Sequence, residues 1–354
     1  EAHRRRMTPT IESAWASGRN NFNLIRLIAA WLVIYSHGWA ITGSAGVDTI
    51  GAFTHIKSGG ALAVDAFFLI SGFLVAASFQ RNPLREFILA RALRIYPALI
   101  VCVLLSVCVL GPLLTTAPDY WGDSKTWRYL WANASLWRAE FWLPGVFDAL
   151  PRTAVNGSLW TLPIEGRLYL ALMVAGLTGM LAPKRYLPAW TLAIAAACAF
   201  AYLRAPLPEH LRYLMWVTGF FITGTLCWAY RQRIPLSIWP LLALLVAALA
   251  SRGTGWFGLA YAPLLVYATL YVALIPKLPA IARNDLSYGL YLYGWPMQQL
   301  AFLAGANTVP GNIAAATVLA LVCAALSWFV VERPALAWKR RLIARSPAPV
   351  GAHR

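Results

Sequence analysis

Long apolar runs follow one another along the chain and limit its possible folds more than any other feature. A helix needs roughly 17 to 25 residues to cross a hydrocarbon core of about 30 Å. We find about ten such runs, whereas a closed barrel would give shorter, alternating segments. The sequence therefore predicts an all-α polytopic membrane protein with about ten transmembrane helices. The predicted spans cover residues 22–42, 60–80, 93–114, 158–181, 187–203, 211–230, 236–250, 256–275, 286–306 and 313–331.

Composition supports a lipid environment. Only 12% of the 354 residues are charged, whereas a soluble domain carries about a quarter. The 17 Trp and 15 Tyr residues are typical of chains whose amphipathic rings collect at the two membrane interfaces. All 5 cysteines lie in apolar runs without a CxxC pair, so neither a disulfide framework nor a metal site is predicted.

The positions of the basic residues orient the chain in the bilayer. If the N-terminus is cytoplasmic, most of the 30 Lys and Arg residues fall in cytoplasmic segments, as the positive-inside rule requires. Both termini are then cytoplasmic, and the longest loop, residues 115–157, is outside. Anionic lipid headgroups account for the net charge of +17, so we expect the lipid bilayer as a partner and no nucleic acid.

This topology divides the chain into three parts. We expect a cytoplasmic N-terminal segment over residues 1–20, a transmembrane domain over 21–334 and a basic cytoplasmic tail over 335–354. The first apolar run lacks a small-residue cleavage signature, so we expect a retained helix and not a signal peptide. In the outer loop, the segment from Trp127 to Trp137 spaces bulky apolar residues as an amphipathic helix at the interface would.

Ionisable residues inside the predicted spans are candidates for function, because a charge in lipid is costly unless it faces the bundle interior. In the first span, Arg26 and His37 share a helix face and lie about 16 Å apart along the axis. Asp65 in the second span is predicted near the depth of His37, where its carboxylate would hold the imidazole in one tautomer. The alternatives are a satisfied interior histidine and an ion pair between Asp65 and Arg167 or another cation.

The fourth span adds a third ionisable site. Glu165 and Arg167 are two residues apart and point in different directions on a regular helix, so each needs a partner elsewhere. Pro163 frees a backbone carbonyl one turn earlier and is expected to bend the helix at this depth. We expect His37, Asp65 and Glu165 to surround one cavity in the outer half of the bundle.

A second polar set lies deeper and toward the cytoplasm. Ser71 and Gly72 form a small pair that permits close approach of a backbone or a slender ligand. Arg91 and Arg94 are one turn apart just before the third span, and their guanidinium groups suit phosphate or pyrophosphate oxygens. Arg26 is placed to join them. The alternative is simple contact of these arginines with lipid headgroups.

Five motifs in one order resemble the membrane-bound acyltransferase-3 family of O-acyltransferases, and they extend over nearly the whole chain. They are Arg26 and His37 with ten residues between them, Val64-Asp65-Ala-Phe67-Phe68-x-x-Ser71-Gly72-Phe73, Arg91-x-x-Arg94-x-x-Pro97, Ser158-Leu159-Trp160-x-x-x-x-Glu165, and Trp328-x-x-Val331-Glu332-x-Pro334.

This resemblance implies ten core helices in a bacterial-type inner membrane and transfer of an acyl group from cytoplasmic acyl-CoA. The donor would be acetyl-CoA or another short acyl-CoA, used as a co-substrate with no bound cofactor, and the acceptor a hydroxyl of an extracytoplasmic glycan or lipid-linked glycan. From the spans and the resemblance together we predict His37, Asp65 and Glu165 as the catalytic residues. The predicted donor-binding residues are Arg26, Arg91, Arg94, Ser71 and Gly72, with Arg167, Tyr96, Trp160 and Tyr288 in supporting positions.

The chain departs from the family pattern at one position. Many similar proteins have a histidine where Gly294 stands in the ninth span, so this chain does without that group or supplies it otherwise. Because the sequence ends at Arg354, we also expect no fused hydrolase-like domain.

The expected reaction is attack of an acceptor hydroxyl, deprotonated by His37, on the acyl thioester. Direct attack is the expected route, because no Ser or Cys lies in an evident nucleophile elbow, and a covalent route through His37 or Ser71 stays open. Two other functions also stay open. One is a proton-coupled transporter or flippase of an envelope precursor, and the other is a non-catalytic assembly factor.

Overall fold

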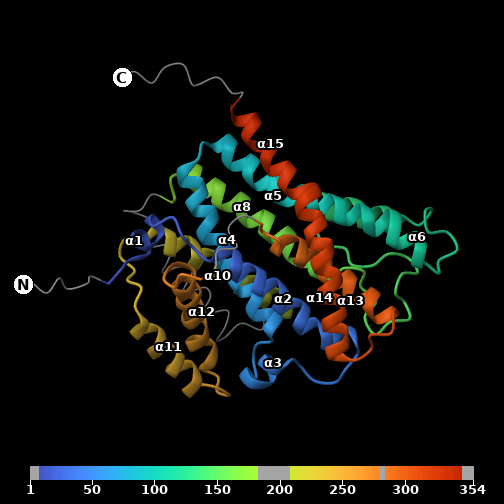
Figure 1. Cartoon of the computed structure of the whole chain (residues 1–354), viewed down its shortest axis with the longest axis horizontal. Helices are drawn as coiled ribbons and strands as arrows, with labels where there is room; N and C mark the ends of the chain where they lie inside the picture. Colours follow the sequence, from blue (N-terminus) through green and yellow to red (C-terminus); the bar gives the residue numbers. More distant parts are fainter. Residues whose placement is uncertain (1–7, 182–207, 279–283, 345–354) are drawn as a thin grey trace, which may run out of the picture. The chain divides into compact units, whose positions relative to one another are not determined.

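The computed structural model describes residues 8–181, 208–278 and 284–344. In these ranges the chain is helical and forms no strand beyond an isolated bridge between Thr10 and Pro235. The prediction of an all-α protein is therefore confirmed. The α-helices are α1 (Ile11–Ala16), α2 (Phe22–Ile41), α3 (Thr49–Thr54), α4 (Gly59–Arg81), α5 (Leu84–Leu105), α6 (Gly111–Leu114), α7 (Ser124–Ala134), α8 (Thr161–Leu177), α10 (Glu209–Ala229), α11 (Ile238–Ala250), α12 (Phe257–Leu274), α13 (Ser287–Leu303), α14 (Val309–Leu326) and α15 (Arg333–Ala344), as Figure 1 shows.

Five helices are long and apolar enough to cross a membrane. They are Phe22–Ile41, Gly59–Arg81, Leu84–Leu114, Phe257–Leu274 and Val309–Trp338. Helices α8, α10, α11 and α13 overlap four more of the predicted runs, and the run at 187–203 lies outside the described residues. The chain is thus a multi-pass membrane protein, while ten spans and the orientation of the termini stay predictions.

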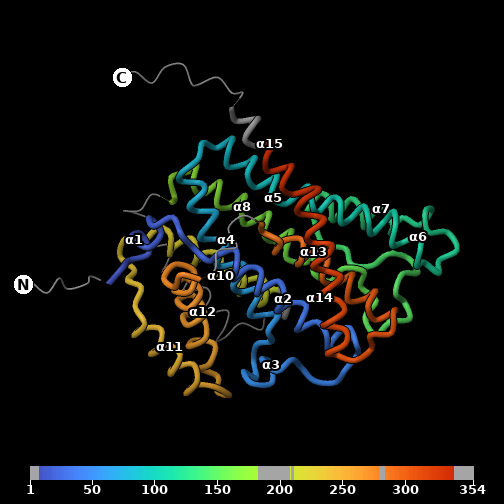
Figure 2. Tube along the Cα trace, viewed as in Figure 1, coloured from blue at the N-terminus to red at the C-terminus, as the bar shows by residue number. Residues whose placement is uncertain are grey.

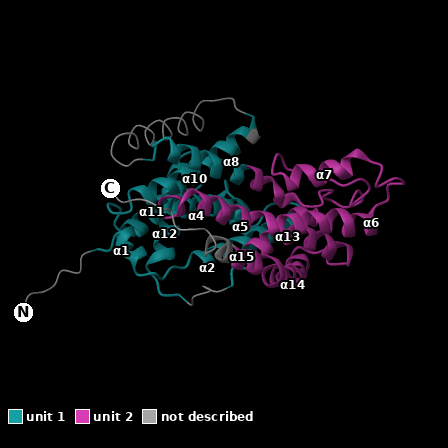
Figure 3. Cartoon of the chain, turned by 90° about the horizontal axis from the view of Figure 1, so that it is seen from above, with its two compact units in different colours: residues 1–39, 45–77, 164–287 teal, residues 40–44, 78–163, 288–354 magenta. Residues whose placement is uncertain are grey.

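The chain divides into two compact units, coloured separately in Figure 3. Unit 1 contains residues 1–39, 45–77 and 164–287. Unit 2 contains residues 40–44, 78–163 and 288–354. Within unit 1, α11 and α12 pack side by side, and within unit 2, α15 lies along α5, as the trace in Figure 2 shows.

Glycines bring α4 and α10 into backbone contact within unit 1. A Cβ atom added at Gly72 would lie 1.9 Å from the carbonyl oxygen of Phe221. A Cβ atom added at Gly224 would lie 2.1 Å from the carbonyl oxygen of Leu69. The Thr225 hydroxyl, also on α10, donates to the Gly72 carbonyl oxygen at 3.3 Å. Small residues permit such close packing between membrane helices, so these contacts fix the backbone on both sides of Ser71.

Two long helices of unit 2 each contain a π-helical segment. Ser106–Leu110 joins α5 to α6, and Ser327–Glu332 joins α14 to α15. In the second segment, the Ser327 hydroxyl donates to Glu332 Oε1 at 3.0 Å. These two residues are five apart, which is the spacing of backbone hydrogen bonds in a π-helix, so the wider turn places them together.

The amphipathic helix predicted in the outer loop is present as α7, in unit 2. It begins at Ser124, earlier than the pattern indicated, and ends at Ala134, before Trp137. Trp127 and Trp131 are exposed, whereas Thr126 and Asn133 on the opposite face are buried. This exposed aromatic face is typical of a helix at a membrane interface.

Candidate functional site

Asp65 lies at the centre of a charged and aromatic cluster in unit 1. Its side chain is fully buried, and Oδ2 accepts three contacts, each of 3.0 Å, from Lys57 Nζ, Trp216 Nε1 and the Tyr261 hydroxyl. The Lys57 ammonium also lies over the Trp216 ring, 4.6 Å from its centroid. Burial lowers the pKa of Lys57, and the neighbouring Asp65 carboxylate opposes that shift. Each member of such a buried pair offsets part of the cost of burying the other's charge.

This arrangement bears on the predicted role of Asp65 toward His37. Asp65 Oδ1 has no hydrogen-bond partner among the residues that the structure describes, and Oδ2 has the three partners above. The structure therefore gives Asp65 the ion pair that was its alternative role, with Lys57 as the cation. Orientation of His37 by Asp65 stays a prediction.

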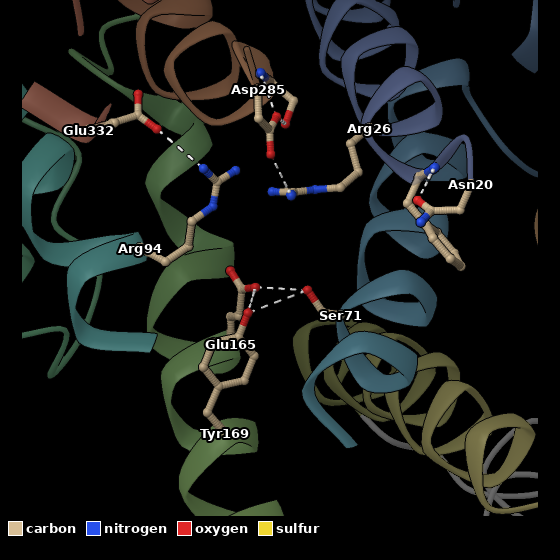
Figure 4. A network of polar contacts seen from close by, with 10 residues as sticks. Asn20, Arg26, Ser71, Arg94, Glu165, Tyr169, Asp285 and Glu332 are labelled. Atoms are coloured by element: carbon tan, nitrogen blue, oxygen red, sulfur yellow. Dashed lines mark hydrogen bonds and ion pairs between the residues drawn. The ribbon is translucent and has the colours of Figure 1, made fainter. Parts of the chain in front are cut away.

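Glu165 belongs to a second cluster in the same unit, which Figure 4 shows from close by. The Ser71 hydroxyl on α4 donates to Glu165 Oε1 on α8 at 2.9 Å. Tyr169, one turn after Glu165, donates its hydroxyl to the same oxygen. The Ser71 and Tyr169 oxygens are 3.5 Å apart. Two hydroxyl groups thus converge on one carboxylate oxygen, and the three side chains are half-buried.

Arg26 forms an ion pair within unit 1. Its Nη1 atom lies 2.9 Å from Asp285 Oδ2, just before α13 (Figure 4). Asp285 Oδ1 accepts from the backbone amide of Ser287 at 3.2 Å and from the Ser287 hydroxyl. The start of α13 therefore orients the Asp285 carboxylate, which in turn orients the Arg26 guanidinium.

His37 lies on α2, three helical turns from Arg26, and its side chain is half-buried with Nδ1 shielded from solvent. It belongs to the same unit as Asp65 and Glu165. Those two carboxylates are the centres of separate clusters, one with Lys57 and one with Ser71. A single cavity shared by all three predicted catalytic residues stays a prediction.

The arginine pair of α5 belongs to unit 2. Arg94 Nη1 lies 3.4 Å from Glu332 Oε2, and the Arg94 guanidinium lies 5.6 Å from the centre of the Tyr288 ring (Figure 4 shows the ion pair). The Tyr288 hydroxyl donates to the backbone carbonyl oxygen of Ile95 at 3.0 Å. Arg91 is half-buried one turn earlier on the same helix. Because Arg26 belongs to unit 1, a phosphate site shared by all three arginines stays a prediction.

The remaining residues singled out from the sequence differ in their burial and in their neighbours. Gly72 is in backbone contact with α10, and Trp160 ends the short 3-10 turn Gly157–Trp160 before α8. Arg167 and Tyr96 are exposed. Gly294 is buried in α13.

Within unit 2, hydrogen bonds join the loop before α8 to α13. Trp295 Nε1 donates to the Ala154 carbonyl oxygen at 2.9 Å, and Gln299 Nε2 donates to the Arg152 carbonyl oxygen at 2.6 Å. Asn156 Nδ2 donates to the Leu292 carbonyl oxygen at 2.9 Å. The end of the outer loop is thus fixed where it enters the membrane helices.

Several residues of these clusters were not singled out by sequence reasoning. They are Lys57, Tyr169, Trp216, Tyr261 and Asp285. Tyr169 could have been found, because residues four apart on a helix share a face. Lys57 and Asp285 lie outside the predicted spans, so nothing in their local sequence pairs them with intramembrane charges.

Comparisons with known proteins agree over nearly the full length of the chain. A family model described as an acyltransferase domain matches residues 19–332. An O-acetyl transferase of Shigella phage Sf6 is 26% identical over 326 residues, which are 89% of this chain and 95% of that protein. Nodulation protein 10 of Rhizobium leguminosarum bv. viciae is 29% identical over 360 residues, covering 92% and 96%. No solved structure matches.

Proposed function

Because this chain belongs to the acyltransferase-3 family, whose model matches residues 19–332, we propose that it transfers a short acyl group from acyl-CoA to a hydroxyl group of an envelope glycan. Acyl transfer by a multi-pass membrane protein is what the family match and the apolar helices establish. The acyl-CoA donor, the glycan or lipid-linked glycan acceptor and a location in the bacterial inner membrane are parts of the proposal. An acetyl group is favoured by the name of the phage relative, an O-acetyl transferase.

The observation that carries the proposal is the set of polar groups within apolar helices of unit 1. Arg26 on α2 and Ser71 on α4 lie in two of the five membrane-spanning helices, and each meets a carboxylate from another segment. Polar groups at such positions are costly in lipid and are typical of substrate paths and reaction centres. A bundle that served only as a scaffold would not need them.

The donor would bind through the arginines. Guanidinium groups bind phosphate oxygens through two parallel hydrogen bonds, which suits the phosphates of CoA. Arg94 is oriented for such a role by Glu332 and by the ring of Tyr288. Arg91 presents a second guanidinium one turn away, and Arg26 is the third candidate.

His37 would act on the acceptor. In its neutral form, an imidazole can take the proton of an acceptor hydroxyl as the oxygen attacks the acyl carbonyl. The half-buried position of His37 on α2 is compatible with access for a hydroxyl group. The outer loop, with exposed tryptophans at positions 127 and 131, would contact sugar rings or the lipid part of the acceptor.

The test is CoA release by purified protein in detergent, measured with a thiol dye in the presence of acyl-CoA and an acceptor glycan. We expect His37→Asn to lower release at least about 100-fold, the lower limit for loss of a general base. His55→Asn is the matched control, because His55 is exposed and has a positive φ of 59°, which asparagine tolerates.

The same assay separates the proposal from its rivals. A transporter or flippase would release no CoA in detergent, where there is no sealed membrane. An assembly factor would tolerate His37→Asn in cells, measured by mass spectrometry of the envelope glycans. Full CoA release by the His37→Asn protein would remove His37 from the reaction.

A further inference from the structure

The Ser71 hydroxyl has a hydrogen-bond partner that is unusual for a serine in a membrane helix. Serine and threonine in helices commonly bond back to the carbonyl oxygen four residues earlier. Other hydroxyls of this chain do so, among them Ser106 to Cys102, Thr223 to Gly219 and Thr225 to Phe221. Ser71 instead donates to Glu165 Oε1 on another helix, at 2.9 Å.

The backbone that carries Ser71 is fixed by its neighbours. A Cβ atom added at Gly72 would clash with the backbone of Phe221, and a Cβ atom added at Gly224 would clash with the backbone of Leu69. Ser71 is therefore held between two points of backbone contact with α10, while its side chain reaches α8. A reacting group on a rigid element keeps its geometry through the reaction.

Ser71 and Glu165 have the geometry of a nucleophile and its base. A serine hydroxyl becomes a nucleophile when a base within hydrogen-bond reach takes its proton, and 2.9 Å is within that reach. Tyr169 lies beside Glu165 on α8, with its hydroxyl 3.5 Å from Ser71 Oγ. A donor at that distance from the nucleophile can reach the oxygen of a carbonyl group that the nucleophile attacks.

We propose that Ser71 carries the acyl group as an ester between the donor and the acceptor, with Glu165 as its base. This inference rests on the proposed function, and it replaces direct attack of the acceptor on the thioester by two displacements. It also gives Ser71 a bond-forming role, beyond the donor contact that the sequence predicts.

The first displacement forms an ester on Ser71 and releases CoA. Ser71 Oγ attacks the thioester carbonyl of acyl-CoA, and its proton passes to Glu165. Tyr169 donates to the developing oxyanion. The carbon–sulfur bond then breaks, and the CoA thiolate leaves with the proton from Glu165 as free thiol. The product is an acyl ester on Ser71.

The second displacement returns the enzyme to its starting state. The acceptor hydroxyl attacks the ester carbonyl of acyl-Ser71 after His37 takes its proton. The bond between Ser71 Oγ and the acyl carbon breaks, and the Ser71 alkoxide takes up a proton from His37 directly or through Glu165. The acceptor leaves as the ester, and no oxidant or further reactant is needed.

Isotope exchange tests this inference without any knowledge of the acceptor. Purified wild-type protein in detergent is mixed with unlabelled acetyl-CoA and labelled CoA. We expect label to enter acetyl-CoA, because the first displacement is reversible when no acceptor is present. Ser71→Ala should abolish exchange, and Glu165→Gln should slow it about 100-fold or more. Ser78→Ala is the matched control on α4, because the Ser78 hydroxyl accepts from Asn82 Nδ2 at 3.3 Å and lies outside the cluster of Glu165.

The ester itself can be trapped and located. After incubation with radiolabelled acetyl-CoA and an acid quench, we expect a label on a peptide containing Ser71 that resists neutral hydroxylamine. Ser71→Cys should carry the label as a thioester, which neutral hydroxylamine removes. Unchanged melting in detergent would show that both Ser71 variants are folded.

The outcomes separate this inference from the proposed function. If wild-type protein releases CoA with an acceptor but shows neither exchange nor label, the covalent step is wrong and the proposed function stands. Label on His37, or full transfer by Ser71→Ala, also overturns the covalent role of Ser71. If the wild-type protein releases no CoA with any acceptor and shows no exchange, both the function and this inference fail.

Discussion

Two carboxylates within apolar helices have partners that give them different chemistry. Asp65 is fully buried and pairs with the Lys57 ammonium. Glu165 is half-buried and accepts from the hydroxyls of Ser71 and Tyr169. Loss of the Asp65 charge would leave the buried Lys57 ammonium unpaired, whereas Glu165 lies beside two hydroxyl groups that can exchange protons with it. Glu165 is therefore the better candidate for proton transfer, and Asp65 the better candidate for a structural anion.

A double-mutant cycle on Asp65 and Lys57 tests this distinction. We expect Asp65→Asn to destabilise the protein by about 3–5 kcal/mol, because removal of one partner leaves the other charge buried and unpaired. Lys57→Met should be damaging for the same reason, and the double variant should recover much of the loss. Thermal unfolding in detergent, with the acyl-transfer rate measured alongside, gives both readouts.

The activity of the double variant decides the role of Asp65. A structural anion predicts that stability and transfer recover together. If stability recovers and transfer does not, Asp65 also acts on His37, as the sequence predicted.

At the scale of the element, the ends of the spans could be predicted where an apolar run and a helix coincide. The runs 22–42 and 60–80 became α2 and α4 with changes of a single residue. The run 93–114 lies inside a longer helix, because α5 begins at Leu84, directly after Pro83. Hydropathy fails there because the first turns of α5 carry charged side chains, whereas the backbone hydrogen bonds continue. Proline at the helix start marks the boundary instead.

The candidate site was less accessible to sequence reasoning than the spans. Ser71, Arg94 and Glu165 could be singled out as polar groups in apolar surroundings. Their partners could not, because contacts such as Ser71 with Glu165 join helices 94 residues apart. Depth along a helix gave no information on rotation about its axis, so the pairing of Asp65 with Lys57 could not be predicted from the sequence.

The contact between α4 and α10 gives a prediction for the element. Gly72→Ala adds a Cβ atom 1.9 Å from a backbone oxygen that no side-chain rotation can move. We expect a loss of stability of about 1–3 kcal/mol from overpacking, together with a lower transfer rate because Ser71 is displaced. Gly255→Ala is the control, since an added Cβ atom there meets nothing within 4 Å. Melting in detergent and CoA release are the measurements, and equal behaviour of the two variants would contradict close packing at Gly72.

At the scale of the whole molecule, the predicted orientation is open to a direct test. We expect Lys125→Cys in the outer loop to react with a membrane-impermeant maleimide on intact cells, in a background without the native cysteines. Ser13→Cys in the N-terminal segment should react only after the membrane is permeabilised. Both positions are exposed. The opposite pattern would place the acyl-CoA side and the acceptor side on the wrong faces of the membrane.

The π-helical segment Ser327–Glu332 affects how deletions and alignment gaps in this part of the chain change the structure. Each residue of an α-helix turns the chain by about 100°. A π-helical turn holds about one residue more than an α-helical turn, so deleting one residue between positions 327 and 332 would bring it close to an α-helical turn and largely keep the faces that follow. The same deletion in the α-helical part of α14 would rotate everything that follows by about that angle. Glu332 would then face away from Arg94, and the exposed ring of Trp338 would turn to a new side. A gap in α14 therefore changes direction as well as length, whereas the π-helical segment can lose one residue with little rotation.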